Sequence, residues 1–330
     1  MALTGLLNLL VLLLFLAPLS PLPAPRASGQ QPRQATESRA AKEDDDVIKL
    51  NTRLVNLNIK VMDRSGRNPR GLSREDFLVL EDGIPQDIAY FEPVDAPVNL
   101  VLLLDLSGSI GSKLDLVRKA AKKFVESLGR DDRMAIASFT LRFKLVSGFT
   151  TDRGLLKDRI DAMRRPGGDT AFYDASWSAF DLLREVKEAR KALVILTDGV
   201  DSSDIPDEEG SRRSFDQLME RAVEEDVSVY PIYFDTEPEV SDSGYTPRVF
   251  ARARKQLEAL ADQTGGTYFK VSRGDDLNGV YARVGEELRT LYSLAYVPKD
   301  TRRDGRWRKV SITVNRPGVV GRTRRGYYAK

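Results

Sequence analysis

The sequence predicts an α/β protein with a doubly wound, mostly parallel sheet and helices on both faces. This domain is inserted between N- and C-terminal β-segments that form a small β-sandwich. Two largely apolar runs of strand length, 98–104 and 192–197, are each followed by an aspartate. Between residues 98 and 291, such runs alternate with amphipathic helical segments, which is typical of a parallel sheet. The segments on either side read as extended strands, so we expect them to build a separate β-structure.

The chain is long enough for more than one domain, because single hydrophobic cores rarely grow beyond about 250–300 residues. We expect five segments along its 330 residues. They are a signal peptide (1–27), a disordered linker (28–47), an N-terminal β-module (48–97), the α/β domain (98–291) and C-terminal β-strands (292–330) packed with the β-module.

The N-terminal segment resembles an export signal. Residues 1–22 carry no charged side chain, and their apolar core at 6–16 is too short to span a bilayer comfortably. We therefore expect cleavage near Ala24 or Ala27, with no transmembrane span afterwards, and an exported protein that is periplasmic, secreted or at the cell surface. An uncleaved N-terminal anchor is the alternative, because no lysine or arginine precedes the apolar core.

The N-terminal β-module begins with an alternating strand at 52–62, which places Asn56, Asn58 and Lys60 on the face opposite its apolar residues. Two further strands are expected at 77–81 and 88–92. The loop between them contains Asp82-Gly83, a strong hairpin-turn signal.

The α/β domain should contain six strands and six helices. The strands are expected at 98–104, 133–139, 143–149, 192–197, 227–233 and 267–271, and the helices at 113–129, 155–163, 171–188, 214–225, 251–264 and 277–291. The first helix, for example, gathers its apolar residues on one face and ends at Gly129.

The C-terminal segment shows strand patterns at 293–297, 308–315 and 319–328, and we expect these strands to pair with the N-terminal β-module. The segment is rich in basic residues, which are Arg302, Arg303, Arg306, Arg308, Lys309, Arg316, Arg322, Arg324, Arg325 and Lys330. These residues could bind nucleic acid or an anionic polysaccharide, but charges interleaved along short strands usually form the solvated face of a sheet. For an exported protein we expect no nucleic-acid partner.

The composition excludes several classes of chemistry. Lysine and arginine number 51 against 49 aspartates and glutamates, and the chain has neither histidine nor cysteine. Ser/His/Asp and Cys/His catalysis, the usual zinc sites, thiol redox chemistry and histidine-ligated haem are therefore unavailable. What remains is oxygen-ligand chemistry with cations such as Mg²⁺.

Oxygen-bearing side chains follow the strands of the expected sheet. Asp105, Ser107 and Ser109 come after the first buried strand, Thr170 precedes a helix, and Asp198 follows the second buried strand. Sites in doubly wound sheets form beyond the carboxyl ends of the strands, so we expect these side chains to gather there.

These pieces, DLSGS (105–109), GGDT (167–170) and LTDG (196–199), resemble the metal-ion-dependent adhesion site of the von Willebrand factor type A domain. The resemblance covers about 98–291. It implies that Ser107, Ser109 and Thr170 offer hydroxyl oxygens to a divalent cation, with Asp105 and Asp198 near it directly or through water. The cation would usually be Mg²⁺, with Mn²⁺ or Ca²⁺ as substitutes.

Such a site suits binding better than catalysis. Mg²⁺ readily keeps waters in its octahedral shell, so an acidic side chain of a protein ligand can replace one of them. We therefore expect adhesion-type binding outside the cytoplasm and no enzyme activity. The alternative is a scaffold or assembly subunit of the cell envelope, in which the metal is purely structural.

Two further interpretations of the site residues remain. Thr170 could cap the helix from 171, as Ser112 could cap that from 113, and Asp198-Gly199 could be a simple turn. We expect the neighbouring Asp169, Asp201 and Asp204 in solvated loops.

A metal-dependent phosphohydrolase is disfavoured. Haloacid-dehalogenase-like phosphatases carry a second aspartate two residues after the first, where this chain has Ser107. A subtilisin-like protease would need a histidine.

The flanking segments carry a narrower resemblance, to bacterial exported proteins related to the von Willebrand factor type A domain and described mainly from Acidobacteria. The matching pieces are DRSG (63–66), GLSREDF (71–77) and EDG (81–83) before the domain, and Tyr296, Pro298, DG (304–305) and GYY (326–328) after it. This resemblance implies an architecture and no particular activity.

Overall fold

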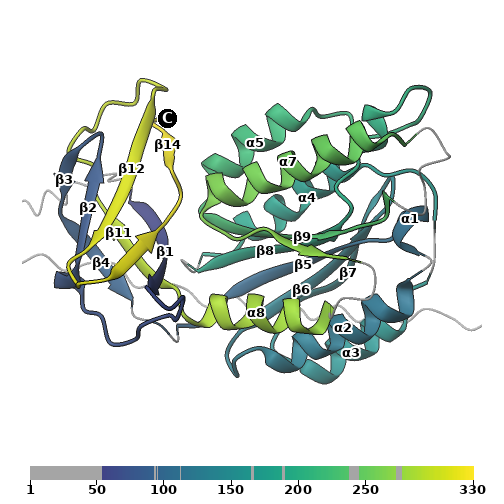
Figure 1. Cartoon of the computed structure of the whole chain (residues 1–330), viewed down its shortest axis with the longest axis horizontal. Coiled ribbons are helices and arrows are strands. Elements are labelled where there is room, and N and C mark those ends of the chain that lie inside the picture. The colour runs from purple at the N-terminus through teal and green to yellow at the C-terminus, as the bar shows by residue number, and fades with distance from the viewer. Residues whose placement is uncertain are drawn as a thin grey trace, which may run out of the picture. The chain divides into compact units, whose positions relative to one another are not determined.

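The computed structural model describes residues 54–92, 94, 96–111, 113–164, 167–187, 190–237, 245–272 and 277–330 (Figure 1). Residues 51–330 form one compact unit. The predicted signal peptide (1–27) and linker (28–47) lie outside the described residues. Within the described part of the chain, no helix combines the length and apolarity that crossing a membrane requires.

The central sheet has six strands in the order β10-β9-β8-β5-β6-β7. They are β5 (Asn99–Asp105), β6 (Arg133–Phe139), β7 (Phe143–Thr150), β8 (Lys191–Thr197), β9 (Val227–Phe234) and β10 (Phe269–Val271). All neighbouring strands pair in parallel except β6 and β7, which are antiparallel. Every residue of the central strand β5 is buried, as expected for a parallel strand covered on both faces.

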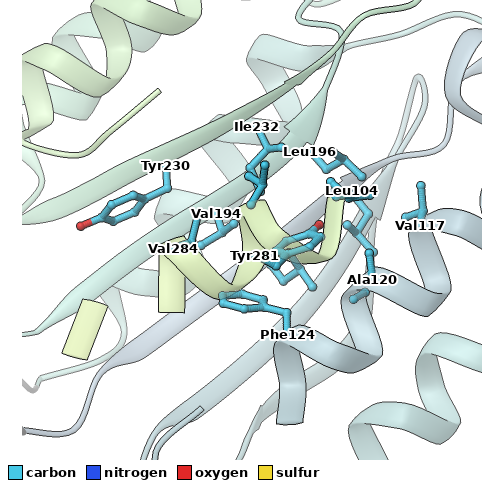
Figure 2. Close-up of a cluster of buried hydrophobic side chains, with 14 of the residues drawn as sticks. Leu104, Val117, Ala120, Phe124, Val194, Leu196, Tyr230, Ile232, Tyr281 and Val284 are labelled. Carbon is cyan, nitrogen blue, oxygen red and sulfur yellow. The ribbon is translucent and has the colours of Figure 1, made fainter. Parts of the chain in front are cut away.

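Helices cover both faces of this sheet. They are α1 (Gly108–Gly111), α2 (Leu114–Ser127), α3 (Arg153–Asp161), α4 (Phe172–Arg184), α5 (Phe215–Glu224), α7 (Pro247–Thr264) and α8 (Leu277–Arg289). Leu102 and Leu104 of β5 pack with α2, α3 and α8, whereas Val101 and Leu103 pack with α4, α5 and α7. Figure 2 shows the first core, in which the rings of Phe124 and Tyr281 stack with centroids 4.9 Å apart. The predicted doubly wound architecture is confirmed.

The segments before and after this domain form two four-stranded antiparallel sheets, β13-β1-β11-β4 and β14-β12-β2-β3. Their strands are β1 (Val55–Asp63), β2 (Phe77–Glu81), β3 (Ile84–Gln86), β4 (Ile88–Glu92), β11 (Tyr292–Tyr296), β12 (Trp307–Val314), β13 (Val319–Arg322) and β14 (Gly326–Tyr328). β1 pairs with β11, and β2 pairs with β12, so each sheet joins the two ends of the described chain. A common apolar core from both sheets confirms the predicted sandwich.

Two strand predictions need correction. The pattern at 319–328 predicts one strand, but the chain forms two strands in different sheets, β13 beside β1 and β14 beside β12. Between them, Thr323 donates a hydrogen bond to the Asn58 carbonyl and Arg324 pairs with Asp226 at 2.9 Å, which turns the chain from one sheet to the other.

The Asp82-Gly83 signal does mark a hairpin turn, with φ of 48° and 82°. It connects β2 to β3, a strand that falls where the sequence predicts a loop. β3 is three residues long and contains Pro85, so no alternating pattern can identify it.

The polar face of β1 contacts the α/β domain. Asn56 donates to Asp226 at 2.8 Å, and Asn58 donates to Ser228 at 3.3 Å. Lys60, further along the strand, contacts Glu287 of α8 at 2.5 Å. One face of β1 therefore packs in the sandwich core, and its polar face forms an interface with the α/β domain.

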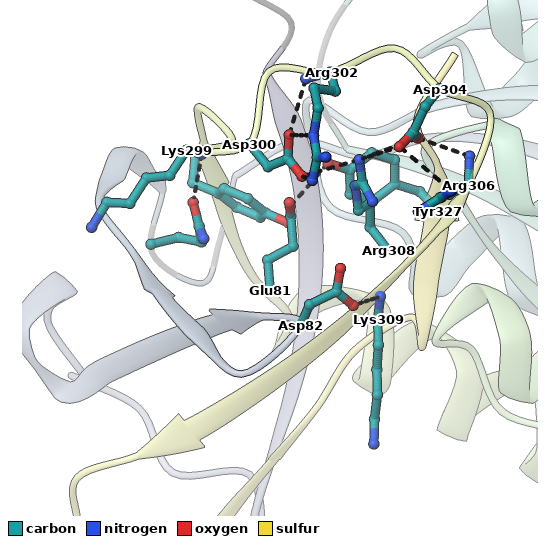
Figure 3. A network of polar contacts seen from close by, with 12 residues as sticks. Glu81, Asp82, Lys299, Asp300, Arg302, Asp304, Arg306, Arg308, Lys309 and Tyr327 are labelled. Atoms are coloured by element: carbon teal, nitrogen blue, oxygen red, sulfur yellow. Dashed lines mark hydrogen bonds and ion pairs between the residues drawn. The ribbon is translucent and has the colours of Figure 1, made fainter.

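A buried carboxylate lies inside the sandwich. Glu81 is 2% exposed and accepts hydrogen bonds from the hydroxyls of Tyr296 (2.7 Å) and Tyr327 (2.9 Å). Figure 3 shows Glu81 and Tyr327 next to a second network, in which Arg308 contacts Asp300 and Asp304, each at 3.1 Å.

Two of the basic residues predicted on a solvated sheet face are in fact buried. Arg308 and Arg324 are 5% and 8% exposed, and each is paired with aspartate. Hydrogen bonds from Arg302 hold the pKa of Asp300 far below its usual range, because they stabilise the charged carboxylate.

Candidate metal centre

The predicted site residues lie at the carboxyl ends of the central strands. Asp105 is the last residue of β5, and Asp198 directly follows β8. These two strands are parallel neighbours, and Leu104 lies opposite Leu196, so both strands end at the same edge of the sheet. The two aspartates are therefore brought together by the topology.

Hydroxyl groups fix the orientation of both carboxylates. Asp105, fully buried, accepts hydrogen bonds from the Ser107 backbone N–H (2.9 Å) and the Thr197 hydroxyl (2.7 Å). Asp198, 3% exposed, accepts from the hydroxyls of Ser109 (2.7 Å) and Thr236 (2.8 Å) on the same oxygen. Each carboxylate is thus held by groups from at least one other part of the chain.

Ser107 and Ser109 connect the two aspartates. The Ser107 and Ser109 Oγ atoms are 3.2 Å apart, within hydrogen-bond distance of each other. Ser107 is 3% exposed, and the chain after it begins the short helix α1. Asp105, Ser107, Ser109 and Asp198 therefore form one continuous hydrogen-bonded cluster.

Hydrogen bonds made by backbone groups hold the loop of Thr170 at the same edge of the sheet. Gly108 donates to the Gly168 carbonyl at 3.2 Å, which holds the loop of Thr170 against α1. The Thr170 N–H donates to the Ser202 hydroxyl at 2.9 Å, and the Thr170 carbonyl accepts from the Ser202 N–H at the same distance. Within the described residues, the Thr170 hydroxyl makes no hydrogen bond to the other four side chains.

The capping interpretation of Thr170 is wrong. The N-cap position of α4 is Ala171, and the Tyr173 and Asp174 N–H groups of its first turn donate to the Asp201 carboxylate and the Ser211 hydroxyl, each at 3.0 Å. The Thr170 hydroxyl therefore remains available to another partner. Ser112, the possible cap of the helix predicted from residue 113, lies outside the described residues.

A tight turn follows Asp198. Gly199 has φ of 74°, and a Cβ atom added there would approach Leu257 Cδ1 to 2.7 Å. A glycine is thus required both by the left-handed backbone and by the packing of α7. The turn directs the Val200 N–H to the second Asp198 oxygen at 3.2 Å.

The two buried carboxylates have raised pKa values. Burial, and then repulsion from Asp198, raises the pKa of Asp105 to about 7, and burial raises the pKa of Asp198 as well. Neither carboxylate forms an ion pair with a lysine or arginine of the described residues. This shortage of positive charge fits a cation between the two side chains.

The donor set fits a hard cation in particular. Two carboxylates and three hydroxyls supply only oxygen atoms, which Mg²⁺, Mn²⁺ and Ca²⁺ prefer. No group of three or more acidic residues that could hold a metal occurs in the described part of the chain. Any cation here would therefore depend on the hydroxyls of Ser107, Ser109 and Thr170 for further ligands.

Sequence patterns missed two threonines that orient the carboxylates, Thr197 and Thr236. Thr197 lies within the LTDG segment, and Thr236 follows β9 by two residues. Because β9 is the parallel neighbour of β8, Thr236 is at the same sheet edge. The rule on strand ends, applied to this third strand, would have identified it.

Asp201 corrects another prediction, because it is fully buried rather than solvated. It accepts hydrogen bonds from the Tyr173 N–H at 3.0 Å and from the N–H (2.9 Å) and hydroxyl (2.5 Å) of Ser211. Asp204 likewise accepts from the Tyr173 hydroxyl at 2.7 Å and pairs with Arg252 at 3.3 Å. Both aspartates fasten the loop after β8 to neighbouring helices.

Comparison with known proteins gives a family for this α/β domain. The family model of the von Willebrand factor type A domain matches residues 99–283, which is more than half of the chain. Among curated proteins, the voltage-dependent calcium channel subunits alpha-2/delta-2 of Homo sapiens and Mus musculus are each 28% identical over 123 residues. That match covers 33% of this chain and 10% of theirs, so the chain matches about a tenth of the length of these relatives.

Similar solved structures include a von Willebrand factor type A protein from Catenulispora acidiphila, with a TM-score of 0.48 and 13% identity over 86% of this chain and 64% of that chain. BatB from Bacteroides thetaiotaomicron has a TM-score of 0.45 and 15% identity, over 58% of this chain and 97% of that chain.

Proposed function

Because the chain belongs to the von Willebrand factor type A domain family, we propose that it binds a protein ligand through a divalent cation at a metal-ion-dependent adhesion site. The cation, Mg²⁺ with Mn²⁺ or Ca²⁺ as substitutes, would be held by Asp105, Ser107, Ser109, Thr170 and Asp198. The observation that carries this proposal is the pair of buried carboxylates, linked by serine hydroxyls and without an ion pair among the described residues.

The chemistry of these donors favours binding. Two carboxylates would do no more than neutralise a divalent cation, and five oxygen donors would leave an octahedral ion room for a further oxygen ligand. A bound cation supplies an electrophilic position that an acidic side chain of the ligand can occupy. The protein's own residues hold the carboxylates in place, through Thr197 on Asp105 and Thr236 on Asp198.

The proposal places this activity outside the cytoplasm and without catalysis. Its support is the uncharged, apolar segment at 1–22 and the resemblance of the flanking segments to bacterial exported proteins. The absence of histidine and cysteine from the whole sequence leaves few groups for general acid–base or nucleophilic chemistry.

The metal part of the proposal is tested by isothermal titration calorimetry with Mg²⁺. We expect Asp105→Asn to abolish binding, because it removes a charge while preserving the shape of the side chain. The matched control is Asp169→Asn, next to Thr170, which should leave Mg²⁺ affinity nearly unchanged. Undiminished Mg²⁺ affinity in Asp105→Asn would refute the site, and circular dichroism would verify that both variants are folded.

The ligand part is tested by affinity capture from bacterial envelope extracts, in Mg²⁺ and in EDTA. Adhesion through the cation predicts partners that disappear on chelation and with the Asp105→Asn variant. A scaffold with a purely structural metal predicts partners that persist in both conditions. The second result would replace binding at the site with the scaffold alternative.

A further inference from the structure

A groove of about 550 Å³ lies between α5 and α7, two helices that run side by side on one face of the central sheet (Figure 1). Its floor includes the half-buried Phe215 of α5 and the half-buried Ala251 and Ala259 of α7. We call it the α5–α7 groove. None of the five proposed metal ligands lines it.

The rim of the groove is basic. Arg248, Arg252 and Lys255 are exposed and occupy positions i, i+4 and i+7 of α7, so they share one side of the helix. At a rise of 1.5 Å per residue, they extend over roughly 10 Å along the helix axis. Asp216 is the one acidic residue lining the groove in the described part of the chain.

The charges on this rim are only partly neutralised. Arg252 pairs with Asp204 of the loop after β8 at 3.3 Å. Arg248 and Lys255 form no ion pair with any of the described residues. Two exposed cations without an ion pair among the described residues therefore lie beside a floor that is apolar apart from Gln256.

The floor of the groove has room for the side chains of a ligand. Alanines at 251 and 259 leave space where larger residues would fill the groove, and Phe215 is fixed by a ring contact with Tyr173, with centroids 5.8 Å apart. An apolar strip with a row of like charges along one side is complementary to an amphipathic helix that carries the opposite charges.

We propose that the α5–α7 groove binds an acidic amphipathic helix of a partner protein. Carboxylates at i, i+4 and i+7 of such a helix match the spacing of Arg248, Arg252 and Lys255, while its apolar residues contact Phe215 and the two alanines. A sulfated polysaccharide would neutralise the cations but leave the apolar floor uncovered. The interaction is independent of the metal site and should persist in EDTA.

The test measures fluorescence anisotropy of a labelled synthetic peptide, a four-turn helix with glutamates along one face and leucines beside them. We expect the full chain to bind this peptide in EDTA, with affinity that falls as salt is added. A scrambled peptide of equal composition should bind about tenfold more weakly, because its charges and apolar residues no longer share a face.

Charge reversal identifies the groove as the binding surface. The double variant Arg248→Glu, Lys255→Glu should weaken peptide binding about tenfold or more, since the altered residues would repel the glutamates. Its control, Lys119→Glu with Lys123→Glu, reverses two exposed charges one helical turn apart on α2 and should leave binding unchanged. Asp105→Asn should also bind normally, which separates this proposal from the metal site.

Three results would overturn the proposal. They are no binding of the peptide to the wild-type chain, equal binding of the scrambled peptide, and undiminished binding by the groove variant. Tighter binding of a sulfated oligosaccharide than of the peptide, lost in the groove variant, would assign the cations to a polysaccharide instead. Circular dichroism of both double variants guards against loss of folding as the cause.

Discussion

Lys60 of β1 donates a hydrogen bond of 2.5 Å to Glu287 of α8, and Thr267 contacts both side chains, at 3.1 Å from Lys60 and 2.6 Å from Glu287. The first strand of the sandwich is thereby fastened to the last helix of the α/β domain. The side chains of Lys60 and Glu287 are only 17% and 7% exposed, so water screens this pair poorly.

Breaking this pair from one side should be costly. Lys60→Met keeps most of the aliphatic stem but leaves the Glu287 carboxylate buried without its cation, so we expect a loss of about 3 kcal/mol in the free energy of unfolding. Urea denaturation measures it. The double variant Lys60→Met, Glu287→Gln should recover part of the loss, because the uncompensated charge is gone.

The matched control is Lys157→Met. Its partner Glu126 is 58% exposed, and exposed ion pairs contribute little to stability. We expect its urea midpoint to stay near that of the wild type. Equal destabilisation by the two lysine variants would mean that burial of the Lys60 pair has no special effect.

The buried carboxylate of the sandwich leads to a second prediction. Tyr296→Phe removes the hydroxyl that donates to Glu81 at 2.7 Å and leaves Tyr327 as the remaining tyrosine donor. A buried, partly unsatisfied carboxylate should cost about 1–3 kcal/mol of unfolding free energy. The exposed Tyr90→Phe serves as the control, and urea midpoints that match for the two variants would contradict the prediction.

The sequence predicts the architecture well because both kinds of periodicity are strong in this chain. Buried runs alternating with amphipathic helices predict the doubly wound sheet, and extended patterns at either side predict the sandwich. The alternation of polar and apolar residues along a strand does not show, however, which groups its polar face contacts. In β1 this face meets Asp226, Ser228 and Glu287 of the α/β domain instead of water alone.

The sequence predicts only those residues of the candidate site that follow an apolar strand or belong to a recognised motif. Asp105 and Asp198 follow apolar runs, so their position is implied by the sheet. Thr236 belongs to no recognised segment, and its role depends on the pairing of β8 with β9. The sequence predicts Asp201 in a solvated loop because it gives no sign that the donors from Tyr173 and Ser211 reach this carboxylate.

Thr236 should matter for the proposed cation although it is not a proposed ligand. Thr236→Val removes the hydroxyl that orients Asp198 while preserving the shape of a fully buried side chain. Groups that orient metal ligands typically change affinity by about 10–100-fold, so we expect Mg²⁺ binding weakened to that extent in calorimetry.

The control for this variant is Thr264→Val. Thr264 is also buried, but it is the last residue of α7, where its hydroxyl donates to the Leu260 carbonyl at 2.8 Å and accepts from the Val229 N–H at 3.1 Å. Its substitution should lower stability without changing Mg²⁺ affinity. If Thr236→Val bound Mg²⁺ as tightly as the wild type, the contact with Asp198 would not orient a metal ligand.

Without metal, the site should make stability depend on pH. The pKa of Asp105 is raised to about 7 in the folded protein, above its ordinary value near 3.8, so the folded state binds more protons than the unfolded state between these two values. The free energy of unfolding should therefore fall as pH rises from about 4 to about 7, and the raised pKa of Asp198 acts in the same direction.

Urea denaturation in EDTA at a series of pH values measures this dependence. Asp105→Asn removes both the titrating group and its repulsion of Asp198, so the variant should show a shallower pH slope and exceed the wild type in stability above about pH 7. Adding Mg²⁺ should stabilise the wild type but not the variant, because the cation would compensate the charges that the variant lacks. An unchanged pH slope in Asp105→Asn would show that the two carboxylates are not the source of the dependence.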